Sequence, residues 1–141
     1  GCGGICDEVG QTKMGKPYGL KTTSENQESD PSYIESPYSY NSLTDFWDNI
    51  QSIKNTWYGK YTAGNNTDGA QYSFHSYFAK YGAEEGKAVE TAIDDAQAKI
   101  KACDVPFRYN YHTAKVLEAI NACTTLSNAL TAANDLLNKQ K

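Results

Sequence analysis

The chain has 141 residues, of which 39% are hydrophobic and 21% charged, and its formal net charge is −4. This length is typical of one domain, and the composition is that of a globular protein rather than a disordered one. The negative charge leaves no basic stripe to neutralise phosphates, which excludes a nucleic-acid footprint. No stretch is long and apolar enough to span a bilayer, so no transmembrane segment is expected.

The first residues, Gly1 to Cys6, lead directly into Asp7 and Glu8 without an initiating Met or a helix cap. The pattern predicts a short helix over roughly residues 3–14. Because no start signal precedes it, we interpret this segment as the remnant, over 1–14, of a longer helix. The chain is therefore expected to be a fragment or a processed chain.

Four cysteines are present: Cys2, Cys6, Cys103 and Cys123. If the last two lie on an antiparallel helical hairpin, they are separated by roughly 15–20 Å along its axis. That separation is too large for a disulfide, and no Cys/His cluster has the spacing of zinc ligands. We expect small buried thiols on helices.

Residues 15–41 contain Pro17, Pro31 and Pro37 together with a polar run from 21 to 30. This composition predicts a long irregular loop between the helix remnant and the helical core. Connections of this length within one domain are usually functional or disordered.

A hydrophobic repeat with intervals of three and four residues follows, formed by Leu43, Phe46, Trp47, Ile50, Ile53 and Trp57. The repeat predicts an amphipathic helix over roughly residues 42–59. Ser42 is a favoured N-cap residue, and Asp45 three residues later completes a start like a capping box. The glycine- and asparagine-rich segment 61–69 is expected to be a loop.

Three further helices are predicted over roughly residues 70–81, 84–103 and 110–139. No alternation typical of a strand occurs among them. The fold class is therefore all-α, an antiparallel up-down helical bundle, and residues 1–141 form one domain with its helical core at 42–141. The residues expected to be buried in one core are Trp47, Ile50, Ile93, Ile120 and Leu130.

Two segments place polar side chains where they could bind a ligand. Residues 34–42 put Glu35, hydroxyls and an amide directly before a helix N-terminus, which offers free N–H groups and a positive dipole. Such a site could hold an anion or a metal-bound ligand, although capping and turn chemistry would explain the same residues. Asp7 and Glu8 form the second candidate; they point about 100° apart on a helix, so they cannot easily face one ligand.

The histidines, His75 and His112, have no carboxylate or cysteine partner nearby in the sequence. We therefore expect a surface or packing role for each. The sequence also lacks a Gly-x-Ser-x-Gly elbow, an HExxH motif and a phosphate loop.

Several segments carry a family resemblance: Ile5 to Gly10, Lys13 to Gly15, Glu35 to Ser42, Asp45-Phe46, Asn49-Ile50, Ala92 to Ala96, Val105 to Phe107 and Val116 to Leu130. Together they resemble the second half of imelysin-like proteins. The resemblance covers nearly the whole chain, and its most specific part is the Glu-Ser segment that leads into the Asn-Ser start of a helix.

The resemblance implies that the chain is one half of a fold built from two helical bundles. Imelysin-like proteins are envelope proteins, often lipid-anchored, and many are associated with iron acquisition. They are classed with the metallopeptidases, and their hallmark is a Gly-x-His-x-x-Glu motif in the first half. This sequence has no such motif, since Phe78 stands at the Glu position after His75, so the chain alone is expected to be inactive as a peptidase.

The leading hypothesis is a binding module that contributes half of an interdomain cleft for a metal ion or a metal-linked ligand. The resemblance carries over the ligand-binding residues Glu35, Ser36, Asn41, Asp45 and Glu8. Their oxygen atoms suit iron or another divalent metal, which is the expected cofactor of the full-length protein. The alternatives are a fragment of a metal-dependent peptidase and a purely structural or partner-binding bundle.

The resemblance also implies a location and a partner. The expected location is the bacterial cell envelope, as a periplasmic protein or an outer-membrane lipoprotein. The expected partner is a missing N-terminal half or a second copy of the chain. The contact would use the N-terminal segment and a face rich in tyrosine, since the chain contains 11 Tyr.

Overall fold

The computed structural model describes residues 1–20, 29–38, 40–60 and 70–140, and all regular elements within these ranges are helical. The all-α prediction is therefore confirmed for this part of the chain, while the predicted loop at 61–69 lies outside it. The elements are α1 (Cys2–Asp7), η1 (Glu8–Met14), α2 (Gly15–Tyr18), η2 (Pro31–Tyr33), α3 (Ser42–Tyr58), α4 (Phe74–Tyr81), α5 (Ala83–Ala102), α6 (Phe107–Asn110) and α7 (Ala114–Lys139).

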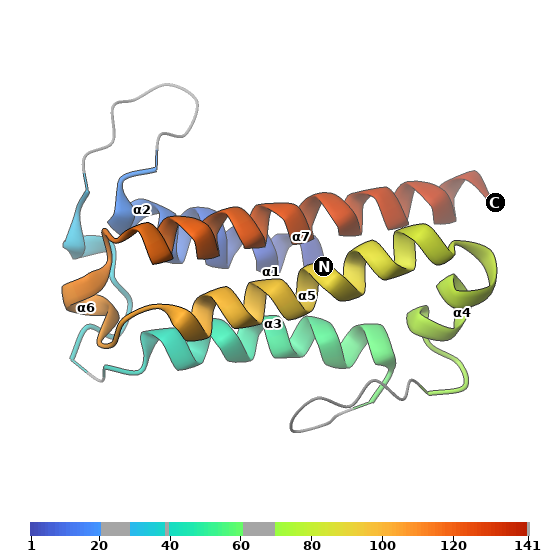
Figure 1. Ribbon diagram of the computed structural model, residues 1–141, viewed down its shortest axis with the longest axis horizontal. Helices are drawn as coiled ribbons and strands as arrows, with labels where there is room; N and C mark the ends of the chain where they lie inside the picture. The colour runs from blue at the N-terminus through green and yellow to red at the C-terminus, as the bar shows by residue number, and fades with distance from the viewer. Residues whose placement is uncertain (21–28, 39, 61–69, 141) are drawn as a thin grey trace.

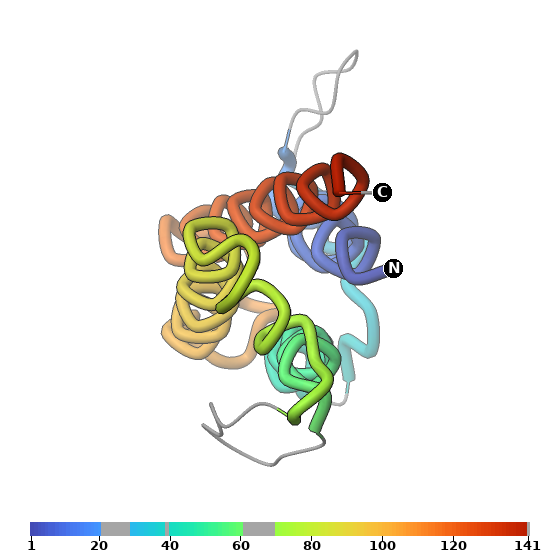
Figure 2. Tube along the Cα trace, turned by 90° about the vertical axis from the view of Figure 1, so that its right-hand side faces the viewer, coloured from blue at the N-terminus to red at the C-terminus, as the bar shows by residue number. Residues whose placement is uncertain are grey.

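Four helical rods make up the bundle. The rod formed by α1 and η1 packs beside α7, α7 packs on α5, and α5 packs on α3 (Figure 1). Viewed along the bundle, the four rods surround one core (Figure 2). Each rod runs opposite to the neighbour that it contacts, as the up-down prediction required, and α4 lies across one end. No helix among the described residues is long and apolar enough to cross a membrane.

Helix α3 begins and ends close to the predicted residues. Its apolar repeat places Phe46, Ile50 and Ile53 in the core, with at most 1% of each residue exposed. Gly59 ends the helix in the left-handed conformation (φ 67°), which glycine adopts without steric cost.

Helices α4 and α7 begin later than predicted, because a capping side chain sets each start. Ser73 Oγ accepts a hydrogen bond from the backbone N–H of Ser76, so α4 begins at Phe74 rather than near residue 70. Thr113 Oγ1 accepts one from the N–H of Val116 and starts α7 at Ala114. The predicted start near 110 falls on the separate short helix α6.

The first rod changes helical type along its length. After α1 the backbone forms the π-helix η1, in which hydrogen bonds join residues five apart. Two glycines allow this geometry: a Cβ at Gly15 would lie 2.8 Å from the carbonyl oxygen of Gly10, and a Cβ at Gly10 would lie 2.8 Å from Cβ of Cys123. The absence of a side chain at Gly10 therefore lets the first rod lie directly against Cys123 on α7.

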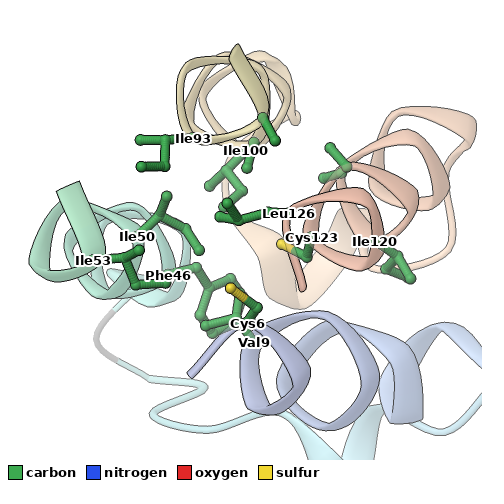
Figure 3. Packing of buried hydrophobic residues seen from close by; sticks show 14 of the residues in the cluster. Cys6, Val9, Phe46, Ile50, Ile53, Ile93, Ile100, Ile120, Cys123 and Leu126 are labelled. Atoms are coloured by element: carbon green, nitrogen blue, oxygen red, sulfur yellow. The ribbon is translucent and has the colours of Figure 1, made fainter. Parts of the chain in front are cut away.

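The core is formed by hydrophobic side chains from all four rods (Figure 3). Ile50, Ile93 and Ile120 are buried, as predicted. Trp47 and Leu130 are partly buried and pack against the core from its edge. Both belong to the apolar stripe of their helix but lie at its edge, where each lines a surface groove. All four cysteines are free; Cys6, Cys103 and Cys123 are buried, whereas Cys2 is half-buried.

Candidate functional site

The segment that precedes α3 is held against the first rod at one end of the bundle (Figure 1). The backbone N–H of Asp30 donates a hydrogen bond to the carbonyl oxygen of Pro17 at 3.0 Å. The Asp30 carboxylate accepts a bond from the N–H of Ser32 at 2.8 Å and so caps η2. The buried side chain of Ile34 then fixes the segment to the core. These contacts fix the backbone that carries the polar residues of the segment.

Two non-glycine residues in this segment have a left-handed backbone. Ser36 has φ 50° and Tyr40 has φ 57°. This conformation is uncommon for residues with a side chain, costs about 1–3 kcal/mol, and is found preferentially at ligand-binding and active sites. Both residues lie within residues 34–42, the segment that the sequence indicated as a candidate site.

Lys13 brings two of the predicted site residues together. Its Nζ lies 3.4 Å from Oε2 of Glu35 and 3.8 Å from Oε1 of Glu8. Glu8 and Lys13 are five residues apart, the spacing that a π-helix places on one side. The lysine side chain is 16% exposed, whereas the two glutamates are 59–60% exposed. A partly buried ammonium group is thus flanked by two carboxylates that face solvent.

The other predicted residues lie nearby but have different roles from those expected. Ser42 is not the N-cap of α3; Asn41 holds that position, without a side-chain capping bond. Ser42 Oγ instead donates a hydrogen bond of 2.9 Å to the backbone carbonyl of Glu35, which ties the segment to α3. Asp45 is exposed on the first turn of α3, and among the described residues its side chain makes no ion pair with Lys13. The structure thus joins Glu8 and Glu35 through Lys13 and leaves Asp45 apart.

The charges of this cluster do not fit a bare metal ion. The Lys13 ammonium lies between the two carboxylates, at the position from which a cation would draw its oxygen ligands. No group of three His, Cys, Asp or Glu residues that could hold a metal ion occurs in the described ranges. The arrangement fits a ligand that itself carries both negative and positive charge.

An aromatic rim surrounds the same end of the bundle; we use this name for Tyr33, Tyr38, Tyr40 and Tyr109, all of which are exposed. The Arg108 guanidinium lies 4.9 Å from the centre of the Tyr38 ring, and Lys16 Nζ lies 5.4 Å from that of Tyr33. A hydrogen bond to Tyr109 raises the pKa of Tyr40.

A second polar cluster, which sequence reasoning missed, lies at the opposite end of the bundle. His75 Nδ1 is 2.5 Å from Oε1 of Glu90, and Trp57 Nε1 donates a hydrogen bond of 3.0 Å to the same oxygen. The sequence analysis found no carboxylate partner for His75, and the fold supplies one in Glu90. This partner stands 15 positions away on α5, outside the range in which a helical repeat would reveal it.

The contacts of His112 agree with the surface or packing role predicted for it. Its exposed ring stacks on Tyr18 with 4.6 Å between the ring centres, and Nδ1 donates a hydrogen bond of 2.7 Å to the Tyr18 carbonyl. This contact is one of packing.

Comparison with known protein families identifies the family to which the chain belongs. A family model described as Imelysin matches residues 1–136. The chain therefore belongs to the imelysin family, and the resemblance inferred from the sequence is confirmed. No curated protein matches the chain.

Two solved structures share the fold. An imelysin peptidase from Bacteroides ovatus is 31% identical with a TM-score of 0.78; the match covers 96% of this chain and 36% of that one. A protein from Parabacteroides distasonis, described as an iron-regulated protein A precursor, is 28% identical with a TM-score of 0.82, and the match covers 95% and 38%. The chain thus spans a little over a third of the length of each relative, in agreement with a fold in which it is one part.

Proposed function

We propose that this chain is a binding module of an imelysin-family protein in the bacterial cell envelope, where it supplies part of a cleft for a metal-linked ligand. The observation that carries the proposal is the placement of Lys13 between Glu8 and Glu35. The link to iron acquisition is supported by the relative that is described as iron-regulated.

The chemistry of the cluster favours a charged chelate over a free ion. An ammonium group binds the anionic oxygens of a chelating molecule through charge-assisted hydrogen bonds. A carboxylate such as that of Glu35 can enter an open coordination position on a hard metal ion. A ferric chelate with carboxylate arms presents both features side by side, and the left-handed turn at Ser36 exposes backbone groups next to them. Asn41 and Asp45 are proposed to line the outer edge of this site.

A peptidase function has less support from this chain. The residues that would hold a catalytic metal in the family motif are not found in the sequence, and Phe78 takes the place of the motif's carboxylate after His75. We therefore assign binding rather than catalysis to the chain itself.

The envelope location rests on the relative from Parabacteroides distasonis, which is described as a precursor. Fractionation of cells that produce the protein tests it: recovery with the periplasm or the membranes supports the proposal, and recovery with the cytosol contradicts it.

The partner is proposed to be a second bundle of the imelysin fold or a second copy of the chain. A groove of about 400 Å³ is open at the end of the bundle where α4 lies, and its lining includes Cys2, Trp57, Phe74 and Leu130. Light scattering distinguishes the two: a mass of two chains identifies a second copy, whereas a monomer over a wide concentration range contradicts self-association.

The binding proposal is tested by titrating ferric citrate into the chain in a calorimeter, with citrate alone as the reference. We expect saturable binding that Glu35→Ala and Lys13→Ala each weaken by at least about tenfold, because each variant removes a charged contact. The thermal midpoint should hardly change in Glu35→Ala, because the Glu35 carboxylate is largely exposed and such ion pairs contribute little to stability.

The matched control is Lys99→Ala, which removes the lysine of an ion pair of similar length, 3.3 Å from Lys99 Nζ to Glu118 Oε2. It should leave the affinity for ferric citrate unchanged. Equal affinities in wild type, Lys13→Ala and Glu35→Ala would overturn the proposal.

A further inference from the structure

A groove between four elements of the fold lies apart from the proposed cleft. It is lined by the start of the first rod, the C-terminal half of α3, helix α4 and the C-terminal half of α7, and Figure 2 views the bundle from this end. Its volume is about 400 Å³, and pockets of about 300–1,000 Å³ hold small organic molecules. We propose that the groove binds a small uncharged molecule with an aromatic ring and one hydroxyl or amide group.

Three stacked aromatic rings form one wall of the groove. The centre of the Trp57 ring lies 5.1 Å from that of Phe78 and 5.9 Å from that of Phe74, with interplanar angles of 26° and 21°. Trp57 and Phe78 are buried, whereas 44% of Phe74 is exposed. Because aromatic rings attract one another in offset stacks, a flat ligand ring can extend this stack at its exposed end.

The polar cluster of His75 and Glu90 holds this wall in place. Glu90 Oε1 accepts a hydrogen bond of 3.0 Å from Trp57 Nε1 and lies 2.5 Å from His75 Nδ1. The first turn of α4, which carries Phe74, is fixed in addition by the Ser73 cap. Because these contacts order the rings before a ligand arrives, binding loses little side-chain entropy at the wall.

The groove favours an uncharged ligand that has one polar end. None of the described side chains that line it is charged, so a charged ligand would lose its hydration without gaining a counter-ion. The hydroxyls of Thr56 and Thr131 donate to carbonyl oxygens of their own helices, which leaves their oxygen atoms as acceptors. The Asn134 carboxamide makes no hydrogen bond within the described ranges, so it offers both a donor and an acceptor.

The groove ends within a polar surface, which favours a small ligand over a protein. Asp135, Asn138 and Lys139 are exposed on α7 and adjoin the lining residues Asn134 and Leu137 in the sequence. A stable protein interface buries about 1,200–2,000 Å² and has an apolar centre within a polar rim. On the α7 side the polar surface begins at the edge of the groove, so the apolar area is that of a small-molecule pocket.

Calorimetric titration of the chain with 2-naphthol at neutral pH tests the proposal, because this probe is uncharged and carries one hydroxyl group on a flat ring system. We expect saturable binding of one molecule per chain. Naphthalene-2-sulfonate, which has the same ring system and a negative charge, should bind at least about tenfold more weakly, since the groove offers no partner for the charge. Asn134→Leu should weaken the binding of 2-naphthol by about two- to tenfold, the effect of one lost hydrogen bond.

Two neighbouring glycines provide a blocking variant and its matched control. Gly3 lines the groove and Gly4 does not, and a Cβ at either position would meet no atom within 4 Å. Both variants should therefore fold, which circular dichroism checks. Gly3→Phe should weaken 2-naphthol binding by at least about tenfold, because its ring occupies the groove, whereas Gly4→Phe should bind as the wild type does. Absence of saturable binding, or equal affinities in Gly3→Phe and the wild type, would overturn the inference.

Two further measurements separate this site from the other proposals. Glu35→Ala should bind 2-naphthol normally, so failure of the cleft proposal and failure of this one are distinguishable. Light scattering of the titrated solutions shows whether a second copy of the chain covers the groove instead. A mass of two chains that Gly3→Phe reduces to one, with no 2-naphthol bound to the wild type, would overturn the small-molecule assignment.

Discussion

Gln97 Nε2 donates a hydrogen bond of 2.9 Å to Oε1 of Gln51, across the buried contact between α5 and α3. Gln51 in turn donates from Nε2 to Oδ1 of Asn55 at 3.0 Å. The two bonds fix the orientation of the Gln51 amide, since its oxygen accepts one bond and its nitrogen donates the other. Farther along the same contact lie the Lys54–Asp94 pair and the Trp57–Glu90 bond. The two helices are therefore joined by a polar seam beside their apolar stripes.

This seam predicts a specific stability loss. Gln97→Ala removes the hydrogen bond that Gln97 donates to Oε1 of the buried Gln51 and should lower the free energy of unfolding by about 0.5–1.5 kcal/mol. Gln71→Ala, at an exposed position, should change it by less than about 0.5 kcal/mol. Urea denaturation followed by circular dichroism measures both, and equal values would show that the bond contributes nothing.

The apolar core predicts larger losses. Ile50 and Ile120 come from helices on different sides of the bundle, and both are buried. Replacing either with Ala should cost about 2–5 kcal/mol, because it removes buried methylene groups and leaves a cavity. Val105→Ala is the control, since Val105 is 74% exposed and should lose little. A loss below 1 kcal/mol at Ile50, roughly the cost of one buried CH₂ group, would contradict this packing.

Two glycines of the first rod should respond in opposite directions. A Cβ at Gly10 would meet Cβ of Cys123 at 2.8 Å, whereas a Cβ at Gly4 meets no atom within 4 Å. Gly10→Ala should therefore destabilise the chain by about 1–3 kcal/mol through overpacking. Gly4→Ala should stabilise it by about 0.4–1 kcal/mol, because alanine has fewer unfolded conformations. Thermal midpoints that shift in the same direction would contradict the close packing of η1 on α7.

Alkaline pH should unfold the chain. Burial raises the pKa of Cys6 and Cys123 from 9.0 to about 12, and that of Cys103 to about 11. The unfolded state therefore loses these protons first, so stability is fully present below pH 9 and falls as pH rises from 9 towards 12. Denaturant midpoints measured across this range test the sign. Cys123→Ala should flatten the slope, and a stability that increases above pH 9 would contradict the burial.

Helical periodicity was sufficient to predict where the rods lie in the sequence. It was not sufficient to predict every helix start or the burial of every residue. The repeat from Leu43 to Trp57 predicted α3 to within one residue at its end. The starts of α4 and α7 depend on single side-chain caps at Ser73 and Thr113, which a repeat does not show. Trp47 was assigned to the core because it lies on the apolar stripe. The stripe shows which side of the helix faces the core, but not how deeply each side chain is buried.

The candidate sites depended on contacts between distant positions. The sequence indicated Glu35 and Glu8 separately, and their common partner Lys13 became visible only when 22 positions of chain were folded back, from Lys13 to Glu35. The pair of His75 and Glu90 joins two helices and has no local pattern. Residue type and spacing indicated the candidate residues near a helix end, whereas the position of Lys13 between two carboxylates, which disfavours a bare metal ion there, required the fold.

The most direct test of the binding proposal is the position of iron in crystals of the chain grown with ferric citrate, measured by anomalous diffraction at the iron edge. The account predicts an iron peak beside the Glu35 carboxylate, with the citrate oxygens in contact with Lys13, and no such peak in crystals of Glu35→Ala. Iron bound only elsewhere on the chain, or an occupied site that is the same in Glu35→Ala, would contradict it.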